Sequence, residues 1–277
     1  MKESKKVCLI TGCNSGIGKI AAIEIAKQGF EIIMLVRNSQ KSKNAFEEIK
    51  TESNSEDVKM FFVDFASQES IRQVAKVVKK NYSKIDILIN NAGVYKKKLE
   101  LTVDGYETTI AVNYLATFLL TNLLLDLVKK SQLKRIINVS SMLYLKGKLD
   151  LNEELTYSGK YNQTKAYANS KLLMIYFTQE LARRLKKDDV VVNCLHPGVI
   201  ATQIFRDFPK WLNKISKYII TDIKKGSEPL IYVATSDEAN SVSGKYFYKE
   251  KLVENSKLKL DKELFLKVWN YSLKKTS

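Results

Sequence analysis

The chain has 277 residues, of which 45% are hydrophobic and 27% are charged, and its formal net charge at pH 7 is +16. Apolar residues at this frequency exclude a disordered chain, and three cysteines in this length exclude a disulfide-stabilised scaffold. The excess charge comes mainly from lysines on polar helix faces and loops. Without an arginine cluster, it indicates a solvated surface rather than a nucleic-acid-binding module.

Short β-rich apolar runs alternate with helical patterns along most of the chain. In chain order we expect strand 6–10, helix 17–28, strand 31–36, helix 40–50, strand 58–63, helix 68–80, strand 85–89, helix 106–130, strand 135–140, helix 166–185 and strand 190–195. Continuous Ile, Val and Leu strands joined by helical crossovers indicate a parallel sheet with helices on both faces. Because no Gly-, Ser- or Pro-rich linker divides the chain, we predict one Rossmann-type, doubly wound α/β domain over residues 1–277.

No targeting or membrane-spanning segment is predicted. The first six residues are largely charged, and the apolar run Val7–Ile10 is too short for a signal peptide. The most apolar stretch, residues 114–128, is interrupted by polar residues and is shorter than the roughly 20 residues that span a membrane. We therefore expect a cytoplasmic protein with reduced thiols.

A glycine-rich loop, Thr11–Gly18, lies directly between the first predicted strand and the first predicted helix. Its glycines permit a tight turn, close approach of the backbone to a pyrophosphate, and close packing of helix against strand. The helix that follows offers unpaired N–H groups and the positive end of its dipole to phosphates. The alternative is a glycine-rich turn that binds no ligand. We assign these residues to dinucleotide binding: Gly12, Asn14, Ser15, Gly16, Ile17 and Gly18.

Three further motifs occur in the order and on the elements that one enzyme family uses. Asn90–Gly93 follows the fourth strand, Tyr167–Lys171 is a Tyr-x-x-x-Lys motif on a long helix, and Pro197-Gly198 follows the sixth strand. Together with the Gly-x-x-x-Gly-x-Gly loop, they make most of the chain similar to the short-chain dehydrogenase/reductase family. Finer features resemble its retinol-dehydrogenase-like branch: Val112–Leu115, Arg135–Ser141, Ser170–Leu172, Glu180–Leu185, His196–Gly198, Gly244–Phe247 and Trp269-Asn270. Members of that branch often carry an N-terminal membrane anchor, which we do not predict here.

The resemblance implies a mostly parallel sheet of seven strands and further contacts with a dinucleotide. Asp64 is implied to lie near the adenine ring, although it is also a suitable N-cap for the following helix. Thr202 is implied to contact the cofactor carboxamide. The remaining implied cofactor contacts are Asn91, Ala92, Gly93, Tyr167, Lys171, Pro197 and Gly198. Family members commonly pair through two long helices, so a homodimer or tetramer is implied.

The end of the second strand distinguishes the two nicotinamide cofactors. An acidic residue there binds the adenosine ribose hydroxyls, whereas an arginine attracts a 2′-phosphate. This strand ends Val36-Arg37-Asn38, without a carboxylate, and Arg37 can form charge-assisted hydrogen bonds to a phosphate. We therefore expect NADP(H) rather than NAD(H); the alternative is a surface Arg37 that contacts water.

Tyr167 and Lys171 are four residues apart and therefore share one helix face. Hydride exchange between a carbonyl and an alcohol needs a proton donor, and a tyrosine with its ordinary pKa of about 10 needs that pKa lowered. The Lys171 ammonium, with the positive charge of an oxidised nicotinamide, would favour the phenolate. A second copy of the motif, Tyr161–Lys165, lies six residues upstream. We choose Tyr167 because Ser170–Leu172 continues the helix sequence that the resemblance implies.

The resemblance implies two more members of the catalytic group. Ser141 would orient the substrate oxygen, with Ser140 as the adjacent alternative, and a serine that merely ends a strand as the other interpretation. Asn113 would support a water relay to Lys171, and a buried polar role suits an asparagine in an apolar helix. His196 is the single histidine, so no metal cluster is expected from it, and we assign it no catalytic role.

The family places its substrate-covering segment, or lid, at about residues 203–225, ahead of a C-terminal extension at about 245–277. Phe205, Phe208 and Trp211 would line an apolar substrate pocket there. The same segment has the pattern of a core-facing amphipathic helix, or of a helix that makes peripheral contact with a membrane through lysines and an apolar stripe.

These features together predict an NADP(H)-dependent oxidoreductase that interconverts an apolar aldehyde or ketone and its alcohol. One alternative within the family is a carbon–carbon double-bond reductase. Another is a regulator that senses the dinucleotide without turnover, although the intact Ser141, Tyr167 and Lys171 argue against it.

Overall fold

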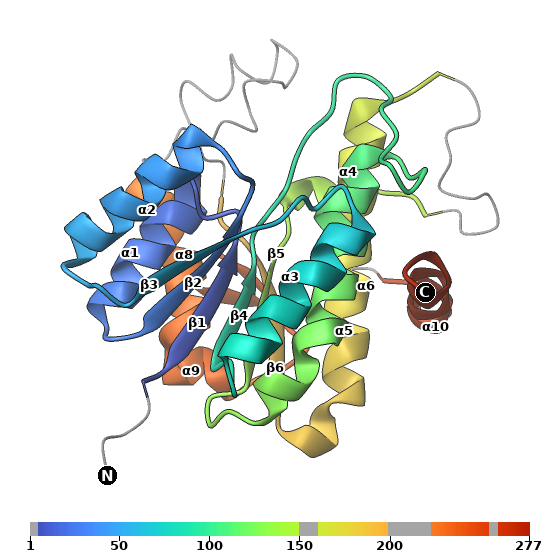
Figure 1. The fold of residues 1–277 in the computed structure, drawn as a ribbon. Helices are drawn as coiled ribbons and strands as arrows, with labels where there is room; N and C mark the ends of the chain where they lie inside the picture. The colour runs from blue at the N-terminus through green and yellow to red at the C-terminus, as the bar shows by residue number, and fades with distance from the viewer. Residues whose placement is uncertain (1–4, 150–159, 199–222, 255–259) are drawn as a thin grey trace.

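The computed structural model describes residues 5–149, 160–198, 223–254 and 260–277, arranged around one twisted sheet (Figure 1). The strands follow the order β3-β2-β1-β4-β5-β6-β7-β8. They are β1 Val7–Thr11, β2 Glu31–Val36, β3 Val58–Phe62, β4 Ile87–Asn90, β5 Arg135–Val139, β6 Val191–His196, β7 Tyr246–Tyr248 and β8 Lys251–Val253. Strands β1 to β7 pair in parallel and β8 runs antiparallel to β7. The predicted seven-stranded parallel sheet is confirmed, with one short antiparallel strand added at its edge.

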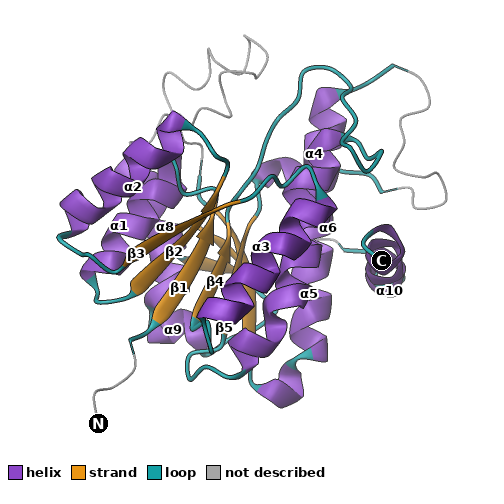
Figure 2. Cartoon of the chain, in the orientation of Figure 1, coloured by secondary structure: helices purple, strands orange, loops and turns teal. Residues whose placement is uncertain are grey.

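Helices cover both faces of the sheet, as Figure 2 shows. One face carries α1 Gly16–Lys27, α2 Gln40–Ser53, α8 Ile223–Thr235 and α9 Asp237–Asn240. The other carries α3 Gln68–Asn81, α5 Ala116–Lys129 and α6 Gln163–Arg184, with α10 Leu264–Lys275 outside α6. Alternate residues of a strand point to opposite faces, so Leu9 joins the core under α5 while Cys8 and Ile10 join the core under α1. Two hydrophobic cores therefore hold the two helical layers.

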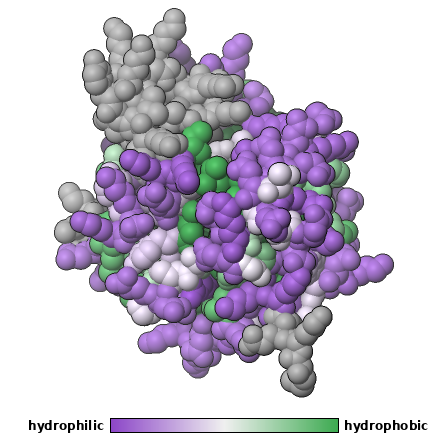
Figure 3. Space-filling view, turned by 90° about the vertical axis from the view of Figure 1, so that its left-hand side faces the viewer, coloured by the Kyte–Doolittle hydropathy of each residue, from purple (hydrophilic) through white to green (hydrophobic). Residues whose placement is uncertain are grey.

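The surface is rich in polar side chains, as the charge balance predicts. Seen from the side that Figure 3 presents, the molecule is mostly hydrophilic, with a narrow hydrophobic strip. This view agrees with the interpretation of the excess lysines as a solvated surface.

The helix predicted over residues 106–130 is built from three consecutive segments. A short turn, α4 Thr108–Ile110, leads into a π-helical turn over Ala111–Leu115 and then into α5. By length and composition the run Thr108–Lys129 is apolar enough to cross a membrane, but 78% of its most apolar window is buried inside the protein. It packs against α3 and α6, so burial in the core accounts for its apolar character.

The C-terminal helix α10 covers part of the pair formed by α5 and α6. The Trp269 ring lies 5.1 Å from the Phe118 ring and 6.2 Å from the Phe177 ring, centre to centre. The Arg184 guanidinium lies 4.1 Å from the centre of the Trp269 ring. The C-terminal helix therefore packs on both long helices of this layer.

Candidate active site

The glycine-rich loop follows β1, whose neighbours in the sheet are β2 and β4. The strand order reverses at this point of the sheet. Gly12 has a φ of +66°, and a Cβ atom there would lie 2.8 Å from the Ala92 Cα, so glycine is required at this position. A Cβ at Gly18 would collide with the Asn91 side chain. Ser15 is the N-cap of α1, yet its hydroxyl makes no capping hydrogen bond, and no acidic residue occupies the first turn. The start of α1 is therefore suited to bind an anionic group.

The loop after β4 is tied to the glycine-rich loop by hydrogen bonds. The Asn91 and Ala92 N–H groups each donate to the Thr11 hydroxyl at 2.9 Å. The Asn91 amide also donates to the Thr11 carbonyl at 2.9 Å. Gly93 faces the proposed catalytic group, because a Cβ there would lie 3.4 Å from Asn113 Oδ1 and 3.8 Å from Lys171 Nζ.

The two residues predicted to contact the adenosine end of a dinucleotide, Arg37 and Asp64, are both exposed at carboxyl ends of strands. The Arg37 guanidinium makes no hydrogen bond or ion pair with another of the described residues. Asp64 accepts a hydrogen bond from the Ala66 N–H at 2.9 Å. The alternative role of Asp64 as a helix N-cap is wrong, because Ser67 caps α3 and accepts from the Ser70 N–H.

Ser141, Tyr167 and Lys171 come together where β5 ends beside α6. The Ser141 side chain lies close enough to the Tyr167 hydroxyl to lower its pKa. The Lys171 ammonium donates to the Val139 carbonyl at 2.9 Å and lies 5.5 Å from the centre of the Tyr167 ring. Tyr167 and Lys171 are 7% and 4% exposed, so both polar groups lie at the edge of the protein interior.

Burial is the main influence on the pKa values of Tyr167 and Lys171. It raises the pKa of Tyr167 to about 12, against the opposing effect of the Ser141 side chain. It lowers the pKa of Lys171 to about 8. The expected lowering of the tyrosine pKa by the ammonium is therefore not seen, because desolvation has the largest effect on this pKa.

Asn113 lies in the π-helical turn and connects the loop after β4 to α6. Its Oδ1 accepts from the Val94 N–H at 2.7 Å, and its amide donates to the Val94 carbonyl at 3.0 Å. The amide also donates to the Ser170 hydroxyl at 3.0 Å, one residue before Lys171. This asparagine is fully buried and its polar atoms are satisfied, which explains how the apolar helix accommodates it.

The geometry favours Tyr167 and Ser141 over their sequence neighbours. Tyr161 lies ahead of α6 and donates its hydroxyl hydrogen to Glu107 Oε1 at 2.9 Å. Burial, and to a smaller extent the Glu107 charge, raise the pKa of Tyr161, and its motif partner Lys165 is exposed. The Ser140 hydroxyl donates to the Lys171 carbonyl at 3.0 Å and is therefore engaged by the α6 backbone.

Two residues near this group had no predicted role. The Tyr95 ring packs 5.5 Å from the Tyr167 ring, and its hydroxyl lies 3.2 Å from the Thr164 hydroxyl. Its position just after Asn90–Gly93 was the available sequence signal. His196 is buried and stacks on Tyr248, with ring centres 5.5 Å apart. Burial, with a smaller contribution from Lys171, lowers its pKa to about 4, so this imidazole is neutral at physiological pH.

The predicted substrate pocket lies outside the described residues. Thr202, Phe205, Phe208 and Trp211 belong to this part of the chain, as does the lid segment up to the start of α8 at Ile223. Pro197 and Gly198 are half-buried directly after β6, at the same sheet edge as Ser141. Within the described ranges, no group of three or more His, Cys, Asp or Glu side chains could hold a metal ion.

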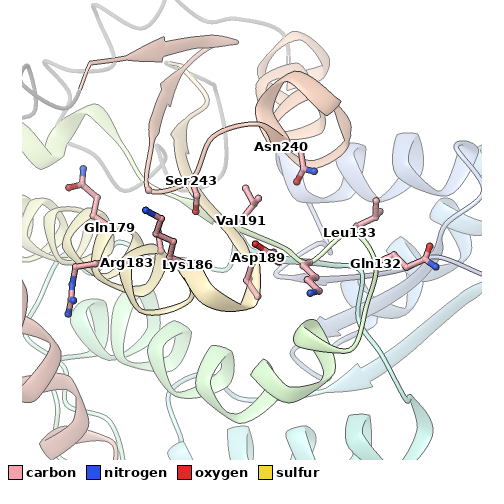
Figure 4. A pocket seen from close by; sticks show the side chains of 13 residues that line it. Gln132, Leu133, Gln179, Arg183, Lys186, Asp189, Val191, Asn240 and Ser243 are labelled. Carbon is pink, nitrogen blue, oxygen red and sulfur yellow. The ribbon is translucent and has the colours of Figure 1, made fainter.

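A groove of about 860 Å³ lies at the opposite sheet edge, where β5 and β6 begin (Figure 4). Its lining includes Lys134, Gln179, Lys186 and Ser243, and none of the predicted site residues. The glycine-rich loop, Ser141 and Tyr167 all follow carboxyl ends of strands or lie beside them, which is where doubly wound folds bind ligands. We therefore place the candidate active site at the carboxyl ends of the strands and not in the groove.

Comparison with known proteins identifies the family. A family model described as short chain dehydrogenase matches residues 6–213. Human retinol dehydrogenase 13 is 40% identical over 250 residues, which cover 87% of this chain and 76% of that protein. Human polyprenol dehydrogenase is 33% identical over 282 residues, which cover 98% of this chain and 85% of that protein.

Solved structures agree with this assignment. A protein from Mycobacterium paratuberculosis superposes with a TM-score of 0.78 at 29% identity, covering 99% of this chain and 94% of that one. A putative short chain dehydrogenase from Escherichia coli CFT073, solved in complex with NADPH, has a TM-score of 0.70 at 26% identity. The match covers 89% of this chain and 97% of that one. The chain is therefore an oxidoreductase-type member of the short chain dehydrogenase family, with retinol dehydrogenases among its relatives.

Proposed function

We propose that the protein is an NADP(H)-dependent oxidoreductase that interconverts an apolar aldehyde or ketone and its alcohol. The observation that carries this proposal is the convergence of Ser141, Tyr167 and Lys171 near the loop after β4, which is hydrogen-bonded to the glycine-rich loop. The names of the relatives, retinol dehydrogenase and polyprenol dehydrogenase, support an apolar alcohol or the corresponding carbonyl as substrate.

The residues at the switch point fit a phosphorylated dinucleotide. The first turn of α1 would hold the pyrophosphate, because its N–H groups have no side-chain cap. The exposed Arg37 would bind the 2′-phosphate of NADP(H), since no acidic residue follows β2. The NADPH complex of the related Escherichia coli protein supports this cofactor.

The chain's own groups supply proton transfer and orientation. When bound, the nicotinamide supplies or accepts the hydride. In the reductive direction the Tyr167 hydroxyl donates a proton to the substrate oxygen, and Ser141 holds that oxygen by a second hydrogen bond. The Lys171 ammonium stabilises the phenolate that this transfer leaves, and so acts against the rise in tyrosine pKa that burial causes. Asn113 holds α6 in position relative to the loop after β4, because its side chain bonds to Val94 and to Ser170.

We further propose a role for the lid segment, a location and an oligomeric state. Residues 203–225 would cover the substrate, with Phe205, Phe208 and Trp211 as apolar contacts. A location in the cytoplasm and assembly into a homodimer or tetramer would be compatible with this chemistry.

The test measures oxidation of NADPH and of NADH against a panel of aldehydes and ketones that includes retinal. Enone substrates are added to detect reduction of a carbon–carbon double bond. We expect carbonyl reduction with a preference for NADPH. Reduction of the enone double bond alone would support the alkene-reductase alternative, and tight NADPH binding without turnover would support the sensor.

A further inference from the structure

A fully buried hydroxyl connects the glycine-rich loop to the segment that carries Arg37. Ser42, in the first turn of α2, is 0% exposed. Its Oγ lies 2.6 Å from the Arg37 carbonyl, 2.9 Å from Asn14 Nδ2 and 2.9 Å from the Ser39 hydroxyl. One side chain therefore contacts the two loops that flank the adenosine end of the proposed cofactor site.

The hydrogen-bonding capacity of Ser42 is completely used. A hydroxyl has one hydrogen to donate and two lone pairs that accept. The Arg37 carbonyl can only accept and the Asn14 amide nitrogen can only donate, so Ser42 donates to Arg37 and accepts from Asn14. The Ser39 hydroxyl must then donate to Ser42, while it accepts from the Ser42 N–H at 3.2 Å. The direction of every hydrogen bond in this cluster is therefore defined. Together these bonds hold the backbone around Arg37 and Ser39 in place.

Ser42 itself cannot touch a bound dinucleotide, because it is buried beneath these loops. Arg37 is exposed and its guanidinium has no partner among the described residues, so its direction depends on the backbone that carries it. Asn14 is half-buried in the glycine-rich loop. The hydrogen bonds of Ser42 fix the distance between this loop and the Arg37 backbone.

We infer that Ser42 is a positioning residue that sets the preference for a 2′-phosphorylated dinucleotide, and this inference rests on the proposed function. Loss of its hydroxyl would leave the Arg37 carbonyl and the Asn14 amide without their buried partner, and the two loops would no longer be held together. The bonds to a 2′-phosphate would weaken, whereas the contacts that NADH and NADPH share would remain.

The test compares equilibrium binding of NADPH and NADH by fluorescence titration in the wild-type protein, Ser42→Ala and Ser53→Ala. Ser53 is the matched control because it is also buried in α2, and its hydroxyl donates to the Ile49 carbonyl of the same helix at 2.6 Å. The measured quantity is the Kd for NADH divided by the Kd for NADPH. This ratio cancels a general loss of folded protein, which a merely structural role would produce.

In Ser42→Ala we expect the ratio to fall by about tenfold, the factor that corresponds to one charge-assisted hydrogen bond. The Ser53→Ala ratio is expected to equal the wild-type ratio. If both Kd values of Ser42→Ala rise by the same factor, the inference is wrong.

A second variant covers the case that Ser42→Ala does not fold. Ser39→Ala removes the hydrogen bond donated to the Ser42 hydroxyl and the bond accepted from the Ser42 N–H, but the Ser42 hydroxyl keeps Arg37 and Asn14 as partners, so a smaller fall of about threefold is expected. An unchanged ratio in Ser39→Ala would then overturn the inference. A wild-type protein that prefers NADH would contradict the proposed cofactor, and with it this role for Ser42. A preference for NADPH in the wild type that Ser42→Ala leaves intact contradicts the inference alone.

Discussion

Lys171 on α6 donates a hydrogen bond from its ammonium to the carbonyl of Val139, the last residue of β5, at 2.9 Å. This bond joins the helix that carries Tyr167 to the strand that leads into Ser141. The positions of all three groups therefore follow from the packing of α6 on β5, and the candidate site is built on rigid elements.

The charge on Lys171 should reduce the stability of the folded protein. Burial lowers the pKa of Lys171 from 10.5 to about 8, so the folded state binds its proton less tightly than the unfolded state. The resulting cost is fully present below pH 8, falls as the pH rises from 8 to 10.5, and is absent above 10.5. We expect Lys171→Met to be more stable at pH 7 by up to about 3 kcal/mol, while turnover is lost.

Urea unfolding at pH 7 and pH 10 measures this effect, with the exposed Lys165→Met on the same helix as the control. The increase in the free energy of unfolding caused by Lys171→Met should be smaller at pH 10 than at pH 7. A Lys171→Met protein that is equally destabilised at both pH values would show that burial of the charge carries no cost.

Tyr95 should act through its ring contact with Tyr167. In Tyr95→Leu the flat surface that packs 5.5 Å from the Tyr167 ring is lost, so the catalytic hydroxyl is held less precisely. We expect kcat to fall by about tenfold or more, with a smaller change in the Kd for NADPH. Tyr95→Phe keeps the ring and removes the contact with Thr164, and it should retain most of the activity. Equal losses in both variants would assign the role to the hydroxyl instead.

Trp269 should hold the C-terminal helix on the protein. Its side chain is 8% exposed and lies among Phe118, Phe177 and Arg184. Trp269→Ala is expected to lower the free energy of unfolding by about 3–5 kcal/mol. Leu266→Ala on the same helix, 55% exposed, should change it by less than about 1 kcal/mol. Denaturant unfolding with similar values for both variants would mean that α10 contributes little to the folded core.

The sequence predicts those parts of the fold and site that depend on short-range patterns. The glycine-rich loop requires Gly12 at a positive φ, and the four-residue spacing from Tyr167 to Lys171 places both on one helix face. Strands β1, β2 and β4 are nearly continuous apolar runs and are almost completely buried, which is the pattern of strands covered on both faces. These requirements involve only residues that are close in the sequence, so they can be recognised without the structure.

Features that arise from tertiary contacts have no local sequence pattern that would locate them, and the position of the seventh strand that the family resemblance implies is one of them. Strands β7 and β8 have three residues each, too few for a periodic pattern. The π-helical turn around Asn113 has backbone hydrogen bonds that span five residues instead of four, and its Asn113 side chain bonds to Val94 and Ser170, which are distant in the sequence. Ser42 has no motif of its own, and its importance comes from a contact with Asn14 far along the chain.

The most direct measurement of the central claim is kcat for NADPH-dependent carbonyl reduction in Tyr167→Phe and Tyr161→Phe. The two tyrosines begin two copies of the same motif. Of these two, only Tyr167 lies close to Ser141 in the part of the chain that the structure describes. We predict that Tyr167→Phe lowers kcat by about 100-fold to 10,000-fold, the contribution of a general acid, with the Kd for NADPH nearly unchanged. Tyr161→Phe should stay within about tenfold of the wild type. A Tyr167→Phe protein that retains wild-type kcat, or a Tyr161→Phe protein that loses it, would contradict the account.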